Sequence, residues 1–199
     1  MIILDSKKLR ASNGKVLDGP LILTPKLLED ERGYFYESWN KNTFDDLVNK
    51  KTNFLQDNHT RSSQGVLRGL HYQIAPMEQE KLVKCSLGSI FDVAVDLRKT
   101  SHTYGCWGGV KLNEENKKQL WVPEGFAHGF LTLSEYAEVQ YKTTSFWNKD
   151  YERSIKWNDA TINIAWPMNE LKGFNILVSK KDKLAPMLRE AEDAGDIFK

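Results

Sequence analysis

Ile90-Phe91-Asp92-Val93-Ala94-Val95-Asp96-Leu97 is the clearest β-strand in this sequence of 199 residues. Side chains alternate between two faces along a strand, so Phe91, Val93, Val95 and Leu97 share one face, while the opposite face carries two aspartates. Similar short apolar runs, separated by Gly, Asn and Pro, fill the sequence from about residue 16 to residue 165. Many short strands punctuated by turns are typical of a sandwich or a barrel. We therefore expect a mainly β protein.

The segment 137–144 alternates in the same way and places Tyr141 on the face shared by Ala137, Val139 and Thr143. A core tyrosine whose hydroxyl finds a partner is one interpretation of Tyr141. In a barrel, however, the inward face can also line a ligand cavity. Both interpretations stay open at this point.

Two segments read as helices. A short helix is expected to open with Thr43 as its N-cap, and a C-terminal helix is expected over residues 184–195. The sequence has no internal repeat and no Ser/Gly-rich linker, so we expect one domain over residues 1–199, in which residues 1–20 form an extension or a strand.

Composition excludes several classes of function. The 28 Lys+Arg and 27 Asp+Glu leave a net charge of +1, which gives no electrostatic reason to expect nucleic acid or a membrane surface as a partner. The apolar runs are too short to cross a membrane, and the first residues lack the features of a signal peptide. Cys85 and Cys106 form no CxxC pair and no metal-spaced cluster, so we expect free thiols and a cytoplasmic location.

The run Trp121-Val122-Pro123-Glu124-Gly125-Phe126-Ala127-His128-Gly129-Phe130 contains PxGxxH. This pattern resembles the second motif of the cupin superfamily, small jelly-roll barrels in which that histidine often binds a metal. The first motif would supply HxH, but the matching stretch here is His71-Tyr72-Gln73. Glutamine is a poor ligand for a transition metal, and the rest of the sequence offers no replacement cluster. We expect a cupin-type jelly roll with no metal.

Arg68 and His71 lie three residues apart around Gly69. Strict alternation puts them on opposite faces, whereas a bulge at Gly69 brings them to the same side. Spacing alone leaves a structural and a functional role equally open. Without a metal, a neutral imidazole suits proton abstraction near neutral pH.

The sequence as a whole resembles the dTDP-4-dehydrorhamnose 3,5-epimerase family. The resemblance runs in the family's order from about residue 20 to residue 187, and it is carried by residues 30–37, 54–59, 65–73, 81–83, 91–96, 119–130 and 141–144. It implies a homodimeric isomerase that needs no cofactor. The implied reaction inverts C3 and C5 of dTDP-4-dehydro-6-deoxy-glucose through an enolate, giving dTDP-4-dehydro-L-rhamnose for dTDP-rhamnose biosynthesis.

The resemblance also implies roles for four residues. His71 is the base, Asp182 is the carboxylate that holds it, Tyr141 is the acid on the opposite face of the sugar, and Lys81 is the cation beside the enolate oxygen. Without the resemblance, Asp182 reads better as a helix cap, and Asp159 is the obvious rival carboxylate.

A further set of residues matches the family's substrate-binding positions, with Trp147 where the family carries an aromatic side chain that stacks on thymine. Ordinary packing is the alternative for Trp147. The set is Arg32, Glu37, Gln56, Asn58, Arg68, His128, Trp147, Glu152 and Lys181.

Three other functions are compatible with parts of the sequence. The first is a mono-epimerase that acts on C3 or C5 alone of a related dTDP-4-keto-6-deoxy sugar. The others are a metal-dependent cupin enzyme and a non-catalytic barrel that binds a sugar nucleotide.

Overall fold

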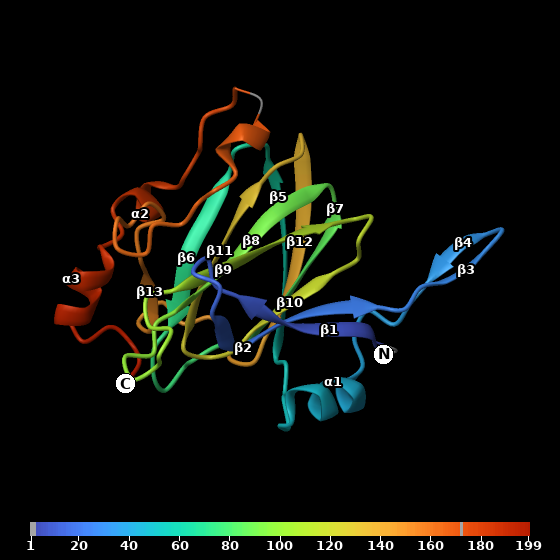
Figure 1. Cartoon of the computed structure of the whole chain (residues 1–199), viewed down its shortest axis with the longest axis horizontal. Helices are drawn as coiled ribbons and strands as arrows, with labels where there is room; N and C mark the ends of the chain where they lie inside the picture. Colours follow the sequence, from blue (N-terminus) through green and yellow to red (C-terminus); the bar gives the residue numbers. More distant parts are fainter. Residues whose placement is uncertain (1–2, 172) are drawn as a thin grey trace.

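Two antiparallel sheets face each other in this computed structural model, which describes residues 3–171 and 173–199 (Figure 1). The six-stranded sheet has the order β1 (Ile3–Arg10), β2 (Val16–Pro25), β10 (Gln119–Val122), β7 (Lys81–Leu87), β12 (Tyr136–Thr143) and β5 (Gln56–Ser63). The five-stranded sheet has the order β13 (Glu152–Ser154), β6 (Leu67–Gln73), β11 (Phe126–Thr132), β8 (Ser89–Asp96) and β9 (Trp107–Asn113). The predicted mainly β architecture is confirmed.

The space between the sheets is the first part of the core. Val83 and Val139 from one sheet pack with Ile90, Ala94 and Phe130 from the other. The predicted alternation of β8 explains this arrangement, because its even-numbered residues point inward. Asp92 is therefore a fully buried carboxylate inside the barrel.

A second part of the core covers the outer face of the five-stranded sheet. Val93, Val95 and Leu97 pack there against Trp166, Val178 and Leu188 of the C-terminal segment. That segment contains the 3₁₀ helix η1 (Met168–Leu171) and the helices α2 (Lys180–Lys183) and α3 (Leu188–Asp193). The last stretch of the chain is thus held against the strand β6 side of the barrel, where α2 contacts β6.

The single C-terminal helix expected over residues 184–195 is wrong in extent. The structure has a four-residue helix before Leu184 and a six-residue helix from Leu188. Pro186 explains the break, because proline lacks an N–H and disfavours helical geometry at the residue before it.

Helix α1 (Lys41–Val48) covers part of the outer face of the six-stranded sheet. Its Phe44 packs with Leu23, Leu82 and Trp121. The N-cap is Asn40 rather than Thr43, because the Asn40 side chain accepts a hydrogen bond from the Thr43 main-chain N–H.

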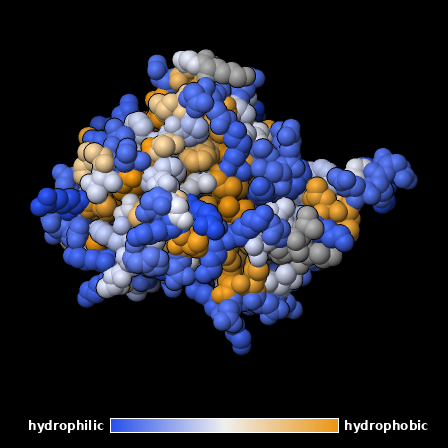
Figure 2. Space-filling model, in the orientation of Figure 1, coloured by the Kyte–Doolittle hydropathy of each residue, from blue (hydrophilic) through white to orange (hydrophobic). Residues whose placement is uncertain are grey.

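A hairpin of β3 (Leu28–Asp30) and β4 (Gly33–Phe35) projects from the barrel (Figure 1). Its tip is hydrophilic, and Figure 2 shows a hydrophobic patch where it joins the body. Leu28 and Phe35 pair across the hairpin at that end, and they are 48% and 64% exposed. Such large apolar side chains are left without cover in one copy of the chain.

No helix within residues 3–171 and 173–199 is long and apolar enough to cross a membrane.

Candidate active site

A cavity of about 290 Å³ opens between the two sheets. It lies where β6 and β12 end and where β5, β7 and β13 begin. Polar and aromatic side chains from all five strands line it, together with a loop after β12. They are Gln56, Asn58, His71, Tyr72, Gln73, Gln79, Lys81, Tyr141, Thr143, Trp147 and Glu152.

Of the two arrangements that the sequence left open around Gly69, the structure has the bulge. In the pairing of β6 with β11, Arg68 lies opposite Phe130 and His71 lies opposite His128. The register shifts between these two pairs. Phe130 and His128 are two residues apart and share a face, so Arg68 and His71 also share one. Gly69 has φ +122°, and a Cβ on it would lie 2.6 Å from the Gly129 Cα, so no other residue fits the bulge.

His71 and Asp182 form a hydrogen-bonded pair. His71 Nε2 lies 2.6 Å from Asp182 Oδ1, and the carboxylate is buried while the ring stays 30% exposed to the cavity. Burial alone would raise the pKa of Asp182, but hydrogen bonds from His71, Ser179 and the Gly69 main chain hold it below its usual value. Nδ1 of His71 has no partner among the described residues, so its lone pair is available to take a proton.

Lys81 is a buried cation at the floor of the cavity. Its Nζ donates a hydrogen bond to the His71 main-chain oxygen over 3.3 Å. Burial lowers the pKa of Lys81 to about 8, although the negative charges of Glu152 and Asp92 act in the opposite direction. The ammonium group therefore carries a charge near neutral pH but with little solvation, which makes its field strong in the cavity.

Tyr141 faces His71 from the other sheet, since β12 belongs to the six-stranded sheet and β6 to the five-stranded one. The pKa of Tyr141 is raised above its usual value, mainly because the side chain is buried. The positive charge of Arg68 opposes this shift, and the negative charge of Glu152 adds to it. The phenol is thus protonated at neutral pH and can act as a proton donor.

His128 lies inside the barrel, opposite His71 in the β6–β11 register. Its Nε2 lies 2.7 Å from Asp92 Oδ1, and both residues are buried. The other carboxylate oxygen, Asp92 Oδ2, has no hydrogen-bond partner among the described residues. His128 is not among the residues that line the cavity.

Five of the predicted binding residues lie in or beside the cavity. Gln56 and Asn58 are two residues apart on β5, so they share a face, and they hydrogen-bond to each other over 2.9 Å. Trp147 lines the rim with its side chain 56% exposed. Glu152 forms a 2.5 Å ion pair with Lys181 from α2, which joins the C-terminal segment to the cavity wall.

Arg68 is exposed, and its Nε donates to Ser62 Oγ over 3.0 Å. It is not a lining residue, but its charge acts on Tyr141.

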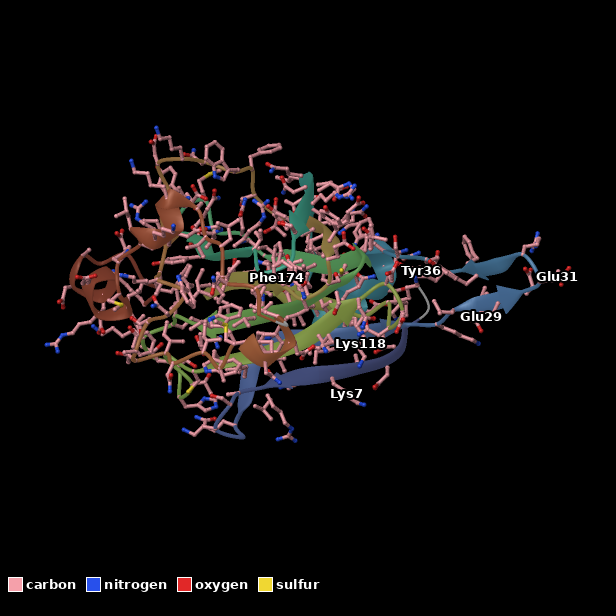
Figure 3. All side chains as sticks on the ribbon, turned by 90° about the horizontal axis from the view of Figure 1, so that it is seen from above. Lys7, Glu29, Glu31, Tyr36, Lys118 and Phe174 are labelled. Carbon is pink, nitrogen blue, oxygen red and sulfur yellow. The ribbon has the colours of Figure 1, made fainter. Side chains whose placement is uncertain are left out.

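Arg32 and Glu37 are not brought to the cavity of their own chain. Arg32 lies at the tip of the β3–β4 hairpin, where it pairs with Asp30 over 2.5 Å and is largely exposed. Figure 3 shows the hairpin, with Glu29 and Glu31 labelled, extending away from the body. No residue of 28–37 lines the cavity.

The rival carboxylate, Asp159, has a structural role. It is buried, and its side chain accepts hydrogen bonds from the main-chain N–H groups of Thr161, Ile162 and Leu188, each over 2.8 Å. It therefore ties a loop to the start of α3 and does not approach His71.

Sequence reasoning did not single out several lining residues, among them Gln73, Gln79 and Thr143. In the sequence, Gln73 is notable only because it stands where a second metal-binding histidine would be. Its inward position on β6 follows from the bulge at Gly69. Gln79 lies outside any strand and gave no periodic signal. Within the described part of the chain, no group of three or more His, Cys, Asp or Glu side chains is arranged to hold a metal.

Known proteins identify the family. The sequence model described as dTDP-4-dehydrorhamnose 3,5-epimerase matches residues 15–190. The protein of that name from Salmonella typhimurium is 54% identical over 171 residues, which are 86% of this chain and 91% of the relative. The one from Shigella flexneri is 56% identical over 162 residues, covering 81% and 87%.

A solved structure of a related enzyme has the same fold as this chain. The dTDP-6-deoxy-D-glucose-3,5-epimerase of Legionella pneumophila, in complex with dTDP-4-keto-L-rhamnose, is 41% identical and has a TM-score of 0.87, with 98% of each chain covered. Matches of this extent and identity confirm the predicted jelly roll and the predicted class of enzyme. The chain belongs to the dTDP-4-dehydrorhamnose 3,5-epimerase family of isomerases, with a cupin-like jelly-roll fold.

Proposed function

We propose that this protein inverts both C3 and C5 of dTDP-4-dehydro-6-deoxy-glucose and yields dTDP-4-dehydro-L-rhamnose. The observation that carries the proposal is the position of a histidine–carboxylate pair and a tyrosine on opposite walls of one cavity. Inversion of a carbon needs a base on one face of the sugar and an acid on the other.

His71 removes the proton. C3 and C5 both lie next to the C4 carbonyl, so the electrons of the broken C–H bond move into an enolate. Asp182 stabilises the imidazolium that forms, because a buried carboxylate 2.6 Å from the ring favours its charged state. It also fixes the ring so that the other nitrogen takes the proton.

Lys81 stabilises the enolate oxygen. A buried ammonium group acts strongly on a developing negative charge beside it. Its hydrogen bond to the His71 main chain fixes the cation beside the base.

Tyr141 returns a proton to the opposite face of the carbon. Its protonated phenol and its position on the far wall support this role. Each inversion leaves His71 protonated and the Tyr141 phenol deprotonated, so His71 releases its proton to solvent and Tyr141 takes one from solvent before the same two transfers invert the second carbon.

Gln56, Asn58, Trp147, Glu152 and Lys181 hold the substrate, with Trp147 offering an exposed ring to the thymine. Arg68 and His128 act at the same site from its edge and from the barrel interior.

We also propose a homodimer, in which the β3–β4 hairpin of one copy brings Arg32 and Glu37 to the cavity of the other. The hairpin extends away from its own barrel (Figure 3), and its apolar root is uncovered. The planar guanidinium group of Arg32 from the second copy would bind two diphosphate oxygens at once. A cytoplasmic location agrees with the two free thiols, Cys85 and Cys106.

Proton exchange in D₂O tests the function. The protein is incubated with dTDP-4-dehydro-6-deoxy-glucose, and NMR follows deuterium at C3 and C5. We expect deuterium at both carbons and a loss of turnover of ~10²–10⁴-fold in His71→Asn. Deuterium at C3 alone would establish the mono-epimerase, and no exchange at all, with dTDP still bound, would establish a binding protein.

A further inference from the structure

The loop that carries Trp147 is not held by apolar packing of its own aromatic side chains. Phe146 and Trp147 are 58% and 56% exposed. The loop follows β12 and reaches Asn148 before β13 begins at Glu152. A loop with exposed aromatic side chains needs polar contacts to keep one conformation.

Gln73 supplies two of these contacts and a third to the neighbouring loop. It is 2% exposed and ends β6. Its Nε2 donates to the main-chain oxygens of Phe146 over 3.2 Å and Met77 over 2.6 Å, and its Oε1 accepts from the Asn148 main-chain N–H over 2.7 Å. A primary amide has two donor hydrogens and one acceptor oxygen, and all of them are used here.

The hydrogen bonds to Phe146 and Asn148 hold the main chain on both sides of Trp147. Two other glutamines of the cavity add to them, since Gln56 Oε1 accepts from the Trp147 main-chain N–H over 3.1 Å and Gln79 Nε2 donates to the Ser145 main-chain oxygen over 2.8 Å. Residues 145–148 are therefore each bonded through the main chain to a glutamine side chain. Only Gln73 touches the loop at two points and also reaches the neighbouring loop at Met77.

No similar side chain can replace this set of bonds. Leucine or methionine fills the volume but removes the partners of two main-chain carbonyl groups and one main-chain N–H, and with them the bonds that hold the loop. Glutamate keeps the acceptor for Asn148 but directs a carboxylate at two carbonyl oxygens.

We propose that Gln73 is a positioning residue for nucleotide recognition, which fixes the main chain on both sides of Trp147 so that the indole is preorganised to stack on the pyrimidine base of a nucleoside diphosphate sugar. The inference rests on the proposed function, in which Trp147 contacts the base. It assigns Gln73 no part in proton transfer, because the hydrogen bonds of its amide go to the loops, whereas His71 is held by Asp182.

Preorganisation predicts a specific kinetic pattern. A free loop must be ordered each time the nucleotide binds, so the affinity falls while the bound sugar reacts as before. We expect Gln73→Leu to raise the Kd for dTDP and the KM for substrate by ~10-fold or more, with kcat within ~3-fold of wild type. Isothermal titration with dTDP and steady-state kinetics measure the two quantities.

Gln64→Leu is the matched control. Gln64 also donates from its side chain to a main-chain oxygen, that of Leu133 over 2.7 Å, and it is not a cavity residue. We expect this variant to keep the wild-type Kd for dTDP even where its Tm falls. An equal loss of affinity in both variants would mean that Gln73 acts through general stability.

A double-mutant cycle with Trp147→Ala identifies the route of the effect. If Gln73 acts through Trp147, then Gln73→Leu costs little further dTDP affinity once the indole is gone. Additive losses would overturn the proposal, and so would an unchanged Kd or a fall in kcat with unchanged KM. Should Gln73→Leu fail to fold, Gln73→Glu takes its place in the same cycle.

The test also separates this inference from the proposed function. A wild-type protein that binds no dTDP would contradict the function itself. A wild-type protein that binds dTDP and loses none of that affinity in the Gln73 variants contradicts only the positioning role.

Discussion

His71 and His128 stand opposite each other in the antiparallel pairing of β6 and β11, and each is hydrogen-bonded to its own aspartate. The two pairs differ in exposure. The His71 side chain is 30% exposed in the cavity and its carboxylate comes from α2, whereas His128 and Asp92 are both buried inside the barrel. Only the first pair is open to the cavity, so exposure distinguishes the proposed base from an internal histidine that the strand register places directly opposite it.

Replacing Asp182 should impair the base without unfolding the site. Asp182→Asn keeps the main-chain N–H that donates to the Ser179 side chain, but it removes the charge that stabilises the imidazolium. We expect kcat to fall by ~10²–10⁴-fold with the Kd for dTDP nearly unchanged. Asp159→Asn is the control, because it weakens only the contacts that tie a loop to the start of α3 and should lower Tm while leaving kcat close to wild type. Equal kcat losses in both would contradict the role given to Asp182.

The pH profile should report Lys81. Its pKa is about 8, and the charged form is the one that stabilises an enolate, so kcat/KM should show an alkaline limb and fall as the pH rises through about 8. Lys81→Arg, which stays charged, should move this fall to higher pH, and Lys81→Met should lose most activity at all pH values. An alkaline limb that persists unchanged in Lys81→Arg would assign it to another group.

Tyr141→Phe should separate the two proton transfers. The base still removes a proton, but the opposite wall has no donor, so deuterium exchange in D₂O should continue while inversion falls by ~10²-fold or more. Comparing the two rates by NMR on one sample checks this directly. A parallel loss of exchange and inversion would show that Tyr141 is not the acid.

Mixed dimers should reveal whether the hairpin serves a second copy. Arg32→Ala and His71→Asn are each expected to be poorly active, but one site of a mixed dimer combines an intact His71 with an intact Arg32 from the other copy. Random mixing should restore on the order of a quarter of wild-type activity, because half of the dimers are mixed and each has one complete site. No recovery after mixing and reassembly would mean that Arg32 acts in its own chain or not at all.

Local sequence pattern predicted the parts of the site that lie on strands. Alternation placed Tyr141 inward, and Gly69 raised the possibility of the bulge that turns His71 and Arg68 to the same face. Each of these rests on residues a few positions apart, where the geometry of a strand is decisive.

Long-range contacts could not be predicted in this way. Asp182 lies 111 residues from His71, and its neighbours favour a helix cap; its main-chain N–H does bond to the Ser179 side chain. Gln73 shows the same limit, because its partners belong to two loops without periodicity. The C-terminal helix was mistaken in extent because helix-forming composition outweighed the effect of Pro186 in the sequence pattern.

Asp182 reaches His71 from the last twenty residues of the chain, which lie on the outside of a barrel that is otherwise complete. The proposed base therefore has its carboxylate only when this outer segment is packed on the barrel. Proteolytic trimming of this tail would silence the chemistry while the nucleotide-binding strands persist, so a loss of turnover with retained dTDP binding would be an early sign of damage at the C-terminus.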